Sequence, residues 1–532
     1  MRDPGRPVIR TAWISVWALG LSACGGGGGG GAPSSYTVSG SLTGLNSGAT
    51  LVLQNNGRNN LALTADGNFT FSASVATGTN YIVTVGTQPN AQTCTVAKGN
   101  GTIGSEPVTT VSVWCTPQIG KFLYLPNPDS NNVTAYSINA STGALTEVAG
   151  SPFTADQAPS LATADPAGKF LYVINSGSTL APPRISSYAI GANGALAQNL
   201  LSPFPVTSSG QAAGPTGFNK PIIHGSGKFV YLTGGGGMLY GASADATGVL
   251  TEVQGMPERV GSAVDYSEFD SAGNFLYVPH VSSSSQPYMG AVAIFKIDKA
   301  SGALTAQGAV ATDGIDPSFA ALTPSGKFLL VVQRQKRALP LAGLGQIAVL
   351  AVDSSSGIPT PVAGSPFATI FGRRTFVVLH PTKNFVYSNT FTAKVGSTIS
   401  VLQIDPNTGV LVSFSEASSG GLGFDSGYTS PVRIEPTGRF LYVGMEGGSI
   451  AGYAIDQTTG ALTRVPGLPL TTDAEALVTL DPSGRYLYSI GSGTGTHTIA
   501  SYAIDRTSGA LTLVNKLATG TRPVMVEVAG RQ

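Results

Sequence analysis

The most regular feature of the chain is a short apolar run that follows a glycine corner. Its type example is Gly-Lys-Phe-Leu-Tyr at 168–172, and related phrases begin at positions 120, 227, 273, 326, 383, 438 and 484. Successive copies are 46 to 59 residues apart. Periods of this size, built from short strands and glycine turns, are typical of β-propeller blades. The pattern therefore predicts an all-β fold made of eight related units.

Each unit is expected to contain four strands. In the second unit we place them at 159–163, 170–174, 185–190 and 195–201. A second phrase, Ile-Asp-x-x-Ser/Thr-Gly-x-Leu, separates the third and fourth strands in several units, as at 297–304. This spacing favours a hairpin whose glycine adopts the left-handed conformation. The Phe, Leu and Tyr of each second strand are expected to pack between blades.

The two ends of the repeat region predict how the ring closes. The first unit has no inner strand of its own, and residues 524–528 resemble an inner strand with no blade after it. Pairing 524–528 with 122–125 would hide two open sheet edges. We therefore predict an eight-bladed β-propeller closed by the C-terminal strand. A seven-bladed ring is the alternative, if the irregular third unit with its glycine run at 234–237 is displaced.

Residues 36–117 show a different pattern, with short alternating runs separated by turns such as Asn56-Gly57. This spacing predicts a β-sandwich of immunoglobulin-like type, N-terminal to the propeller at 118–532. Cys94 and Cys115 lie in it, and an even pair in an exported chain is most simply a disulfide. The segment resembles the small sandwich modules of bacterial envelope lipoproteins.

The N-terminus has the layout of a secretory signal, with Arg2, Arg6 and Arg10 before an apolar run at 11–21. Eleven helical residues reach about 16 Å, too short to span a hydrocarbon core of about 30 Å. Leu-Ser-Ala-Cys at 21–24 resembles a bacterial lipobox, which implies a leader at 1–23 and lipidation of Cys24. Ordinary cleavage after small residues is the alternative. The glycine-rich stretch 24–35 then forms a flexible tether.

The residue after the cysteine is Gly25 rather than Asp, and in this the chain resembles lipoproteins that are sent to the outer membrane. The expected location is therefore the bacterial cell envelope, with the protein held in the outer membrane by its lipid, on the periplasmic side or at the cell surface. Membrane contact through Cys24 is the one partner that the leader implies.

The chain has few charges, with 11% charged residues and a formal net charge of +1. Such a chain offers no field for nucleic acid. Its 4 histidines do not lie at metal-ligand spacing, so we expect no metal and no cofactor. A monomer is the expected state.

The repeated phrases, together with Ala-Gly-Ser-Pro-Phe at 149–153 and 363–367, resemble the lactonase-type β-propellers, a family that includes 6-phosphogluconolactonases. The resemblance covers the chain from Gln118 onward and implies the propeller fold. Lactone-hydrolysing members carry an Arg-His pair on an inner strand, and no unit of this chain has it. The Asn-Glu that ends their next strand remains only as Asn127, Asn175 and Glu446. His224 and His380 match a corner histidine of the family and are expected to be structural.

Lactone hydrolysis needs a base to activate water and a cation or donors for the oxyanion. The groups that could meet near the channel mouth are Asp265, Glu268, His280, Arg334, Arg373, Arg374 and Glu446. Of these, the candidate catalytic residues are Asp265, His280, Arg334 and Glu446. Each also has a structural interpretation as a solvated or paired charge. The basic loop at 334–337 is expected to be a solvent-facing turn. Serine chemistry is not indicated, because no Gly-x-Ser-x-Gly elbow precedes a helix.

Two functions follow. The first is a lipid-anchored propeller that binds a small molecule, a carbohydrate or lactone, or a protein partner at one face, as the missing Arg-His pair favours. The alternative is a hydrolase of a sugar lactone or similar cyclic ester, as the family favours. Whether the chain is an enzyme stays open at this point. A purely architectural surface protein is a third hypothesis.

Overall fold

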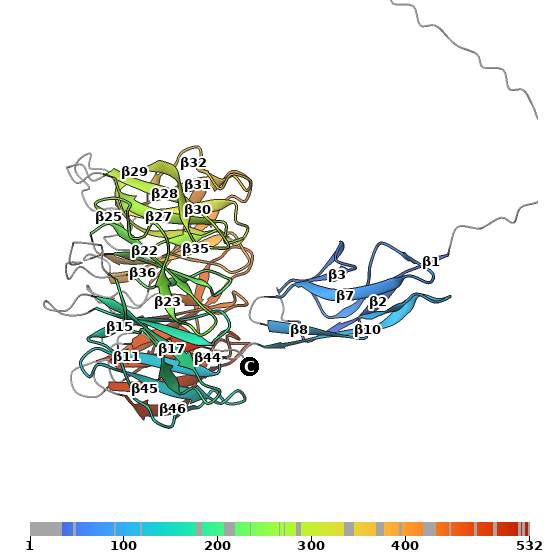
Figure 1. The fold of residues 1–532 in the computed structure, drawn as a ribbon, viewed down its shortest axis with the longest axis horizontal. Coiled ribbons are helices and arrows are strands. Elements are labelled where there is room, and N and C mark those ends of the chain that lie inside the picture. Colours follow the sequence, from blue (N-terminus) through green and yellow to red (C-terminus); the bar gives the residue numbers. More distant parts are fainter. Residues whose placement is uncertain are drawn as a thin grey trace, which may run out of the picture.

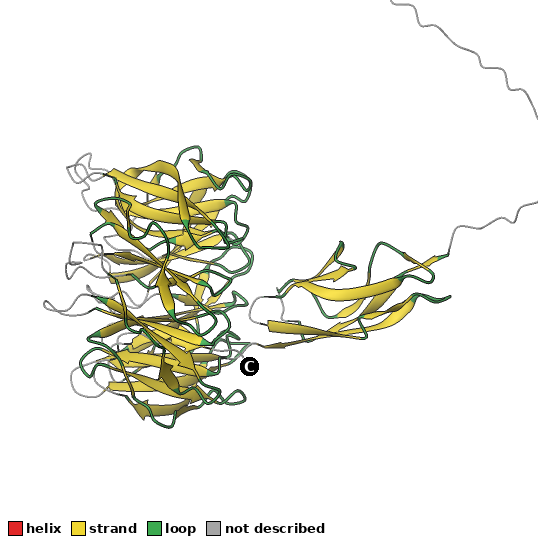
Figure 2. Ribbon diagram, in the orientation of Figure 1, coloured by secondary structure: helices red, strands yellow, loops and turns green. Residues whose placement is uncertain are grey.

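The structure is a computed structural model of the whole chain. It describes residues 34–45, 49–89, 92–117, 120–176, 183–206, 219–234, 236–264, 266–270, 272–282, 289–334, 345–368, 377–392, 396–418, 432–445, 448–472, 476–492, 497–519, 523 and 527–529. These residues form strands, turns and loops and no helix (Figure 2). A helix long and apolar enough to cross a membrane is accordingly not found in this described part.

The N-terminal domain contains two four-stranded sheets, separate from the propeller in Figure 1. One has the order β5 (Gly67–Thr70), β2 (Val38–Thr43), β10 (Val108–Pro117) and β8 (Gln92–Ala97). The other has the order β4 (Asn59–Leu63), β3 (Leu51–Asn55), β7 (Asn80–Thr87) and β9 (Asn100–Thr102). A short pair joins β1 (Ser35–Tyr36) to β6 (Val75–Ala76).

The two sheets share one apolar core, in which Leu51, Phe71 and Val113 are buried. Alternate residues of β2 and β3 are buried, as a sheet with one face on a core requires. Cys94 and Cys115 are direct cross-strand partners on β8 and β10 and form the predicted disulfide. The immunoglobulin-like type of this sandwich stays a prediction.

The propeller begins at β11, and its strands form the repeated sheets seen edge-on in Figure 1. Its first three sheets contain, in chain order, β11 (Phe122–Asn127), β12 (Asn132–Ile138), β13 (Leu145–Glu147) and β14 (Phe153–Thr154); β15 (Pro159–Ala164), β16 (Phe170–Asn175), β17 (Arg184–Ile190), β18 (Leu196–Gln198) and β19 (Phe204–Pro205); and β20 (Ile222–Ile223), β21 (Phe229–Gly234), β22 (Met238–Ala244), β23 (Leu250–Glu252) and β24 (Glu258–Arg259).

The next sheet has nine strands and combines two units: β25 (Ala263–Val264), β26 (Glu268–Phe269), β27 (Phe275–Val281), β28 (Met289–Ile297), β29 (Leu304–Leu322), β30 (Phe328–Arg334), β31 (Gly345–Val352), β32 (Pro359–Pro361) and β33 (Phe367–Ala368). The units merge because β29 is the outer strand of one and continues as the inner strand of the next. Two hydrogen bonds join this strand to β30. The hydroxyl of Thr312 donates to the side-chain oxygen of Gln333, and the side-chain NH2 of Gln333 donates to the backbone carbonyl of Thr312.

The last three sheets complete the propeller. They contain β34 (Val377–Leu379), β35 (Phe385–Thr392), β36 (Gly396–Ile404) and β37 (Leu411–Ser418); β38 (Arg433–Ile434), β39 (Phe440–Met445), β40 (Ser449–Ile455), β41 (Leu462–Arg464) and β42 (Leu470–Thr471); and β43 (Ala476–Leu480), β44 (Tyr486–Ser492), β45 (His497–Ile504) and β46 (Leu511–Ala518).

The chain end closes the first sheet, as predicted. The final strand β47 (Glu527–Ala529) pairs antiparallel with β11, with Phe122 opposite Ala529 and Tyr124 opposite Glu527. Of the predicted pairing segment 524–528, positions 524–526 lie outside the described residues. The first unit therefore takes its inner strand from the opposite end of the chain.

Neighbouring units are joined by a repeated contact. The aromatic ring that opens each second strand lies against a glycine in the next unit's third-to-fourth strand turn, leaving no room for a Cβ there. The pairs are Phe122–Gly194, Phe170–Gly248, Phe229–Gly302, Phe275–Gly357, Phe328–Gly409, Phe385–Gly460, Phe440–Gly509 and Tyr486–Gly143. The last pair returns from β44 to the first unit. These contacts agree with the predicted closure of the ring between the last and the first unit, and the number of blades stays a prediction.

A tyrosine hydroxyl strengthens most of these contacts. Tyr124 donates to the carbonyl of Gly194 at 2.9 Å, and Tyr442 donates to that of Gly509 at 2.7 Å. The same bond joins Tyr231 to Gly302, Tyr277 to Gly357 and Tyr387 to Gly460. The predicted packing of the second-strand aromatics between blades is confirmed. The glycines are in the left-handed conformation, as the hairpin phrase predicted, for example at Gly302 with φ 76°.

The fourth strand of the second unit is shorter than predicted. It ends at Gln198, so Leu200 and Leu201, which the sequence pattern placed in the strand, lie in the following turn. The apolar character of these two residues suggested a strand, although neither is buried.

Candidate functional site

The propeller has two ends that differ in their residues. At the corner end, the first strand of each unit turns into the second, and β11 begins there shortly after the sandwich (Figure 1). At the connection end, the second strand ends and the third begins, as at Asn127 and Asn132. Of the predicted catalytic residues, His280 and Arg334 lie at the connection end, near the ends of β27 and β30.

The corner end is built from buried capping side chains. The carboxylate of Asp481 accepts the backbone N–H groups of Arg485 and Tyr486 at 2.9 and 2.8 Å. Asp165, Asp270 and Glu435 cap their own corners in the same way. These carboxylates satisfy turn amides, which accounts for their burial without a catalytic role.

His224 and His380 occupy the same corner position, as predicted. Each Nε2 bonds to a carbonyl of the next unit's corner, at 2.9 Å to Gly273 and 2.8 Å to Gly438. The Oγ of Ser226 lies 2.7 Å from the Nδ1 of His224. Ser483 makes the same contact with the capping carboxylate of Asp481, so this serine–histidine pair is a turn feature rather than a nucleophile with its base.

The predicted catalytic set is only partly described. Asp265 and Glu446, like the lipidation residue Cys24, lie outside the described residues. Arg334 is the last residue of β30, and its side chain is outside them as well. His280 alone of the four can be followed in full, so the structure does not show whether the set converges.

His280 is a buried residue near the end of β27, with 4% of its surface exposed. Its Nδ1 lies 3.3 Å from the carbonyl of Val278, and its ring packs against Gly261, where a Cβ would collide with it. Burial lowers the pKa of His280, so the imidazole is neutral at pH 7. A neutral imidazole can accept or donate a proton, but this one faces the third unit, on the side of Leu276 and Val278.

Glu268 lies on the inner strand β26, directly opposite Tyr277 of β27. It therefore shares the sheet face of Tyr277, which packs toward the fifth unit, and lies on the face opposite to His280. Burial raises the pKa of Glu268 to about 7, although the N–H of Phe269 favours the carboxylate. A carboxyl group with this pKa exchanges protons near neutral pH.

Every unit has a position equivalent to that of Glu268. It is the inner-strand residue that pairs with the third residue of the second strand, which is Tyr277 in the fourth unit. Arg433 of β38 holds it in the seventh unit, opposite Tyr442. The second and eighth units have Thr163 and Thr479 there. The inner strands are the sheet edges next to the axis, as the bridge between Tyr266 and Phe319 of adjacent units shows. The described inner strands thus place three charged residues at the same level: Glu268, Arg433 and, opposite Tyr124 of the first unit, Glu527.

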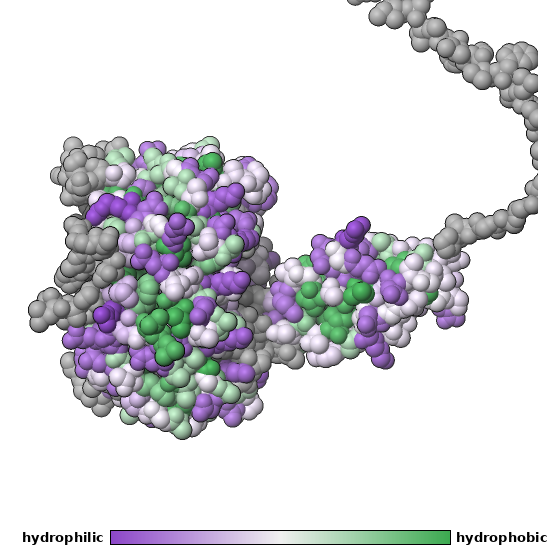
Figure 3. All heavy atoms as spheres, in the orientation of Figure 1, coloured by the Kyte–Doolittle hydropathy of each residue, from purple (hydrophilic) through white to green (hydrophobic). Residues whose placement is uncertain are grey.

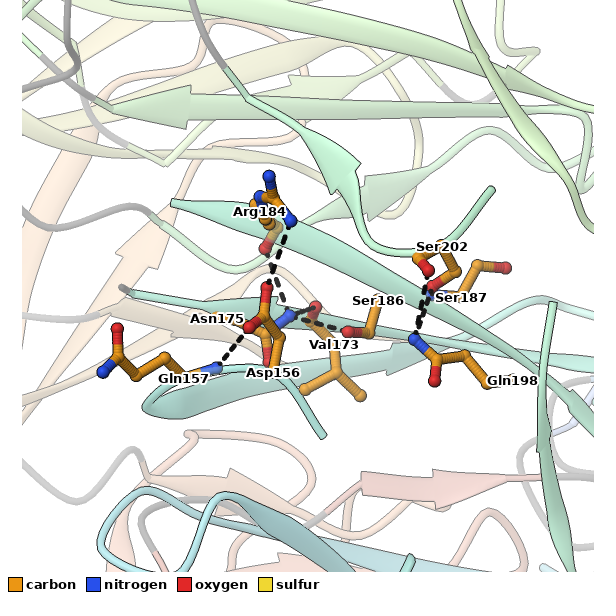
Figure 4. Close-up of polar contacts among 9 residues, drawn as sticks. All are labelled: Asp156, Gln157, Val173, Asn175, Arg184, Ser186, Ser187, Gln198 and Ser202. Carbon is orange, nitrogen blue, oxygen red and sulfur yellow. Dashed lines mark hydrogen bonds and ion pairs between the residues drawn. The ribbon is translucent and has the colours of Figure 1, made fainter. Parts of the chain in front are cut away.

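The connection end of the first two units carries matched asparagines. Asn175 Nδ2 donates to Ser186 Oγ at 2.8 Å and to two backbone carbonyls, as Figure 4 shows. Asn127 makes the equivalent bond to Thr134 Oγ1 at 2.8 Å. Both Oδ1 atoms are buried and have no partner. These are the two residues that match the asparagine of the family motif.

Arg184 and Asp156 lie beside Asn175 (Figure 4). The Arg184 Nη1 and Asp156 Oδ2 atoms are 4.0 Å apart, with both side chains partly exposed. An exposed pair at this distance contributes little to stability. Arg184 is thus a weakly paired cation at the connection end that can bind another anion.

No group of three or more His, Cys, Asp or Glu side chains that could hold a metal occurs in the part of the chain that the structure describes.

The geometry can now be compared with known proteins. The family model for "Lactonase, 7-bladed beta-propeller" matches residues 246–357 and 338–528. The chain belongs to this lactonase family. The family description names seven blades, which is the alternative to the eight that the repeats of this chain predict. No curated protein gave a match.

Solved structures resemble this lactonase-family chain at low identity. They include a periplasmic gluconolactonase of Pseudomonas aeruginosa, with 15% identity, 77% of this chain and 99% of that chain covered, and a TM-score of 0.48. A protein from Lactobacillus plantarum has 17% identity, the coverages 77% and 99%, and a TM-score of 0.45. Sqt1 of Chaetomium thermophilum has 12% identity, the coverages 76% and 88%, and a TM-score of 0.44.

Sequence reasoning left two inner-strand residues out of the catalytic set. The sequence places Glu268 among the groups near the channel mouth but not in the catalytic set, and it gives no signal for Arg433. Both residues are recognised when the inner strands of all units are aligned by the second-strand residue with which they pair, a tyrosine in most units. A charged residue is then conspicuous, because most units have an uncharged residue at that position. The search for a lost family motif drew attention to other positions.

Proposed function

We propose that the protein hydrolyses a lactone or a similar cyclic ester in the central channel, with Glu268 as the general base. The observation that carries the proposal is a partly buried carboxyl group with a pKa of about 7 on an inner strand of a lactonase-family propeller. A general base is most effective when its pKa lies near the working pH.

The reaction needs only water and the ester. The Glu268 carboxylate takes a proton as water attacks the lactone carbonyl, and a tetrahedral oxyanion forms. The ring C–O bond then breaks, and the leaving alkoxide takes the proton that Glu268 accepted from water, which yields the hydroxy acid and restores the carboxylate. Arg433 is the inner-strand cation suited to the oxyanion. Buried His280, neutral at pH 7, belongs to the other face of the sheet and is given a packing role.

The test is a panel of lactones assayed with the wild type and with Glu268→Gln. We expect turnover by the wild type and a loss of about 100-fold or more in kcat/KM for the variant, since general bases contribute about 10²–10⁴-fold. Glu147→Gln, an exposed outer-strand carboxylate, is the matched control and should keep full activity. Wild-type rates at background for every lactone would contradict the proposal.

The binding function keeps one supporting observation, the absence of the Arg-His pair from the inner strands. Saturable binding of a carbohydrate or lactone without turnover would favour it. For the location, we propose an exported envelope protein anchored through Cys24. The Cys94–Cys115 disulfide supports export, because such bonds persist in oxidising compartments. Mass spectrometry of the N-terminal peptide tests the anchor, and an unmodified Cys24 would contradict it.

A further inference from the structure

Two neighbouring leucines stand out on the outer edge of the second unit. Leu200 and Leu201 follow β18, and each has 81% of its surface exposed, the largest exposure of any large apolar residue in the described part of the chain. Leu201 also has a φ of 61°, in the left-handed region. Figure 3 shows an apolar area on the propeller surface in the region where Figure 1 labels β17 and β23.

The equivalent turns of other units show that this arrangement is not required by the fold. Four of them have glycine at the position of Leu201, with φ between 81° and 87°: Gly150, Gly255, Gly364 and Gly467. The preceding position, held by Leu200, is Ala149, Gln254, Ala363 and Pro466 in those turns. A leucine in the left-handed conformation is strained, and an exposed one gains nothing from burial. Neither packing nor turn geometry accounts for the pair.

The size and charge of this leucine pair indicate what covers it. A stable protein interface buries about 800 Å² on each partner, far more than two side chains supply. Residues 195–203 contain no charged side chain, so the surroundings suit an uncharged, aliphatic occupant. Two leucines do suffice as a secondary contact when another group holds the protein at a lipid surface. The predicted lipid on Cys24 is such a group, since only nine residues lie between Cys24 and Ser34, where the described structure begins.

We propose that Leu200 and Leu201 insert into the lipid surface to which the chain is tethered through Cys24. The outer edge of the second unit then lies on the bilayer, and the axis of the propeller runs along the membrane plane. Both ends of the channel stay open to water in this orientation. The inference is independent of lactone hydrolysis and adds a membrane-facing side to the propeller.

The test places a fluorescent reporter at the turn. The chain without its predicted leader is coupled through the Cys24 thiol to a maleimide phospholipid in phosphatidylethanolamine and phosphatidylglycerol vesicles with brominated acyl chains. Cys94 and Cys115 are joined in the disulfide, so Cys24 is the reactive thiol, and coupling does not depend on natural lipidation. In a Trp114→Phe background, Leu200→Trp is compared with Gln254→Trp, which reports from the equivalent turn of the third unit.

We expect the bromolipid to quench the fluorescence of the Leu200→Trp chain at least twofold more than that of the Gln254→Trp chain. Adding Leu201→Gly to Leu200→Trp should reduce the quenching while leaving Tm unchanged or higher, because glycine suits the left-handed turn. Equal quenching at both positions would overturn the proposal. A second result would also overturn it: a dimer of the wild type in vesicle-free solution that dissociates when Leu200→Ser and Leu201→Gly are introduced. The leucine pair would then bind a second copy of the chain.

Discussion

At the residue scale, the carboxyl group of Glu268 differs from the other buried carboxyl groups of the propeller. Asp165, Asp270, Glu435 and Asp481 are used by corner amides, and each has a clear structural role. Glu268 has no such turn to cap, and the N–H of Phe269 is its one identified backbone donor. Burial without compensation keeps its proton near neutral pH.

This residue should make stability depend on pH. The raised pKa means that the folded chain binds more protons than the unfolded chain between about pH 4.5 and pH 7, so the unfolding free energy falls as pH rises through that window. Glu268→Gln should abolish this fall and be more stable than the wild type at pH 8, by up to about 3 kcal/mol. Urea unfolding at pH 5 and pH 8 measures it. The same pH dependence in wild type and variant would show that Glu268 is not buried in this way.

At the element scale, the ring is held by one contact repeated between blades. Three of the eight interfaces lack the tyrosine bond, and one of them belongs to the fifth unit, which has Leu330 at the tyrosine's position. The other two have a tyrosine that makes no such bond. Tyr172 and Tyr488 have buried hydroxyls without partners, and serines of the third strands bond the glycine carbonyls instead. Ser187 reaches Gly248 at 2.7 Å, and Ser501 reaches Gly143 at 2.6 Å. The interface that closes the ring thus uses a serine in place of the tyrosine.

Tyr442 and Tyr488 form a matched pair for mutation, because the first hydroxyl has a hydrogen-bond partner and the second has none among the described residues. Tyr442→Phe removes the donor to Gly509 and leaves a buried carbonyl unsatisfied, so we expect a loss of about 1–3 kcal/mol in unfolding free energy. Tyr488→Phe removes a hydroxyl that has no partner and should cost nothing or stabilise. Thermal and denaturant unfolding of both variants measures the difference. Equal losses would contradict the assigned hydrogen bonds.

The sandwich strands give a further prediction. The disulfide joins β8 to β10 across 21 residues, and in the chain-entropy model such a loop is worth roughly 3 kcal/mol. Replacing both Cys94 and Cys115 by Ala should destabilise the sandwich by that order and leave the propeller's unfolding transition in place. Calorimetry of the full chain resolves the two. A matching loss in the propeller transition would mean that the domains unfold as one unit.

At the scale of the whole molecule, the sequence predicted what repeats and missed what does not. The glycine corners, the left-handed hairpin glycines and the closure by the C-terminal strand follow from local turn chemistry and open sheet edges, and eight copies reinforce each signal. The merged strand β29 was not predicted, because its continuity is seen only in the pairing of one strand with both β28 and β30. The candidate site was the least predictable part. Asp265 and Glu446 lie outside the described residues, and Glu268 and Arg433 are recognised only when strand pairing is known.

Blade number is the architectural prediction that remains. The contacts from Phe122–Gly194 round to Tyr486–Gly143 lead us to expect eight blades in an experimental structure. A crystal or cryo-EM map counts them directly. Seven blades around the axis, with one unit displaced, would contradict the closure of β44 onto the first unit.

The central claim is that Glu268 acts as the base for lactone hydrolysis, and the pH profile of kcat/KM tests it most directly. Rates are measured between pH 5 and pH 9 on the lactone that the wild type turns over fastest, against uncatalysed hydrolysis. The account predicts that kcat/KM rises with pH to a plateau with a midpoint near pH 7, and that Glu268→Gln loses both the rate and the midpoint. An unchanged profile in Glu268→Gln would contradict it.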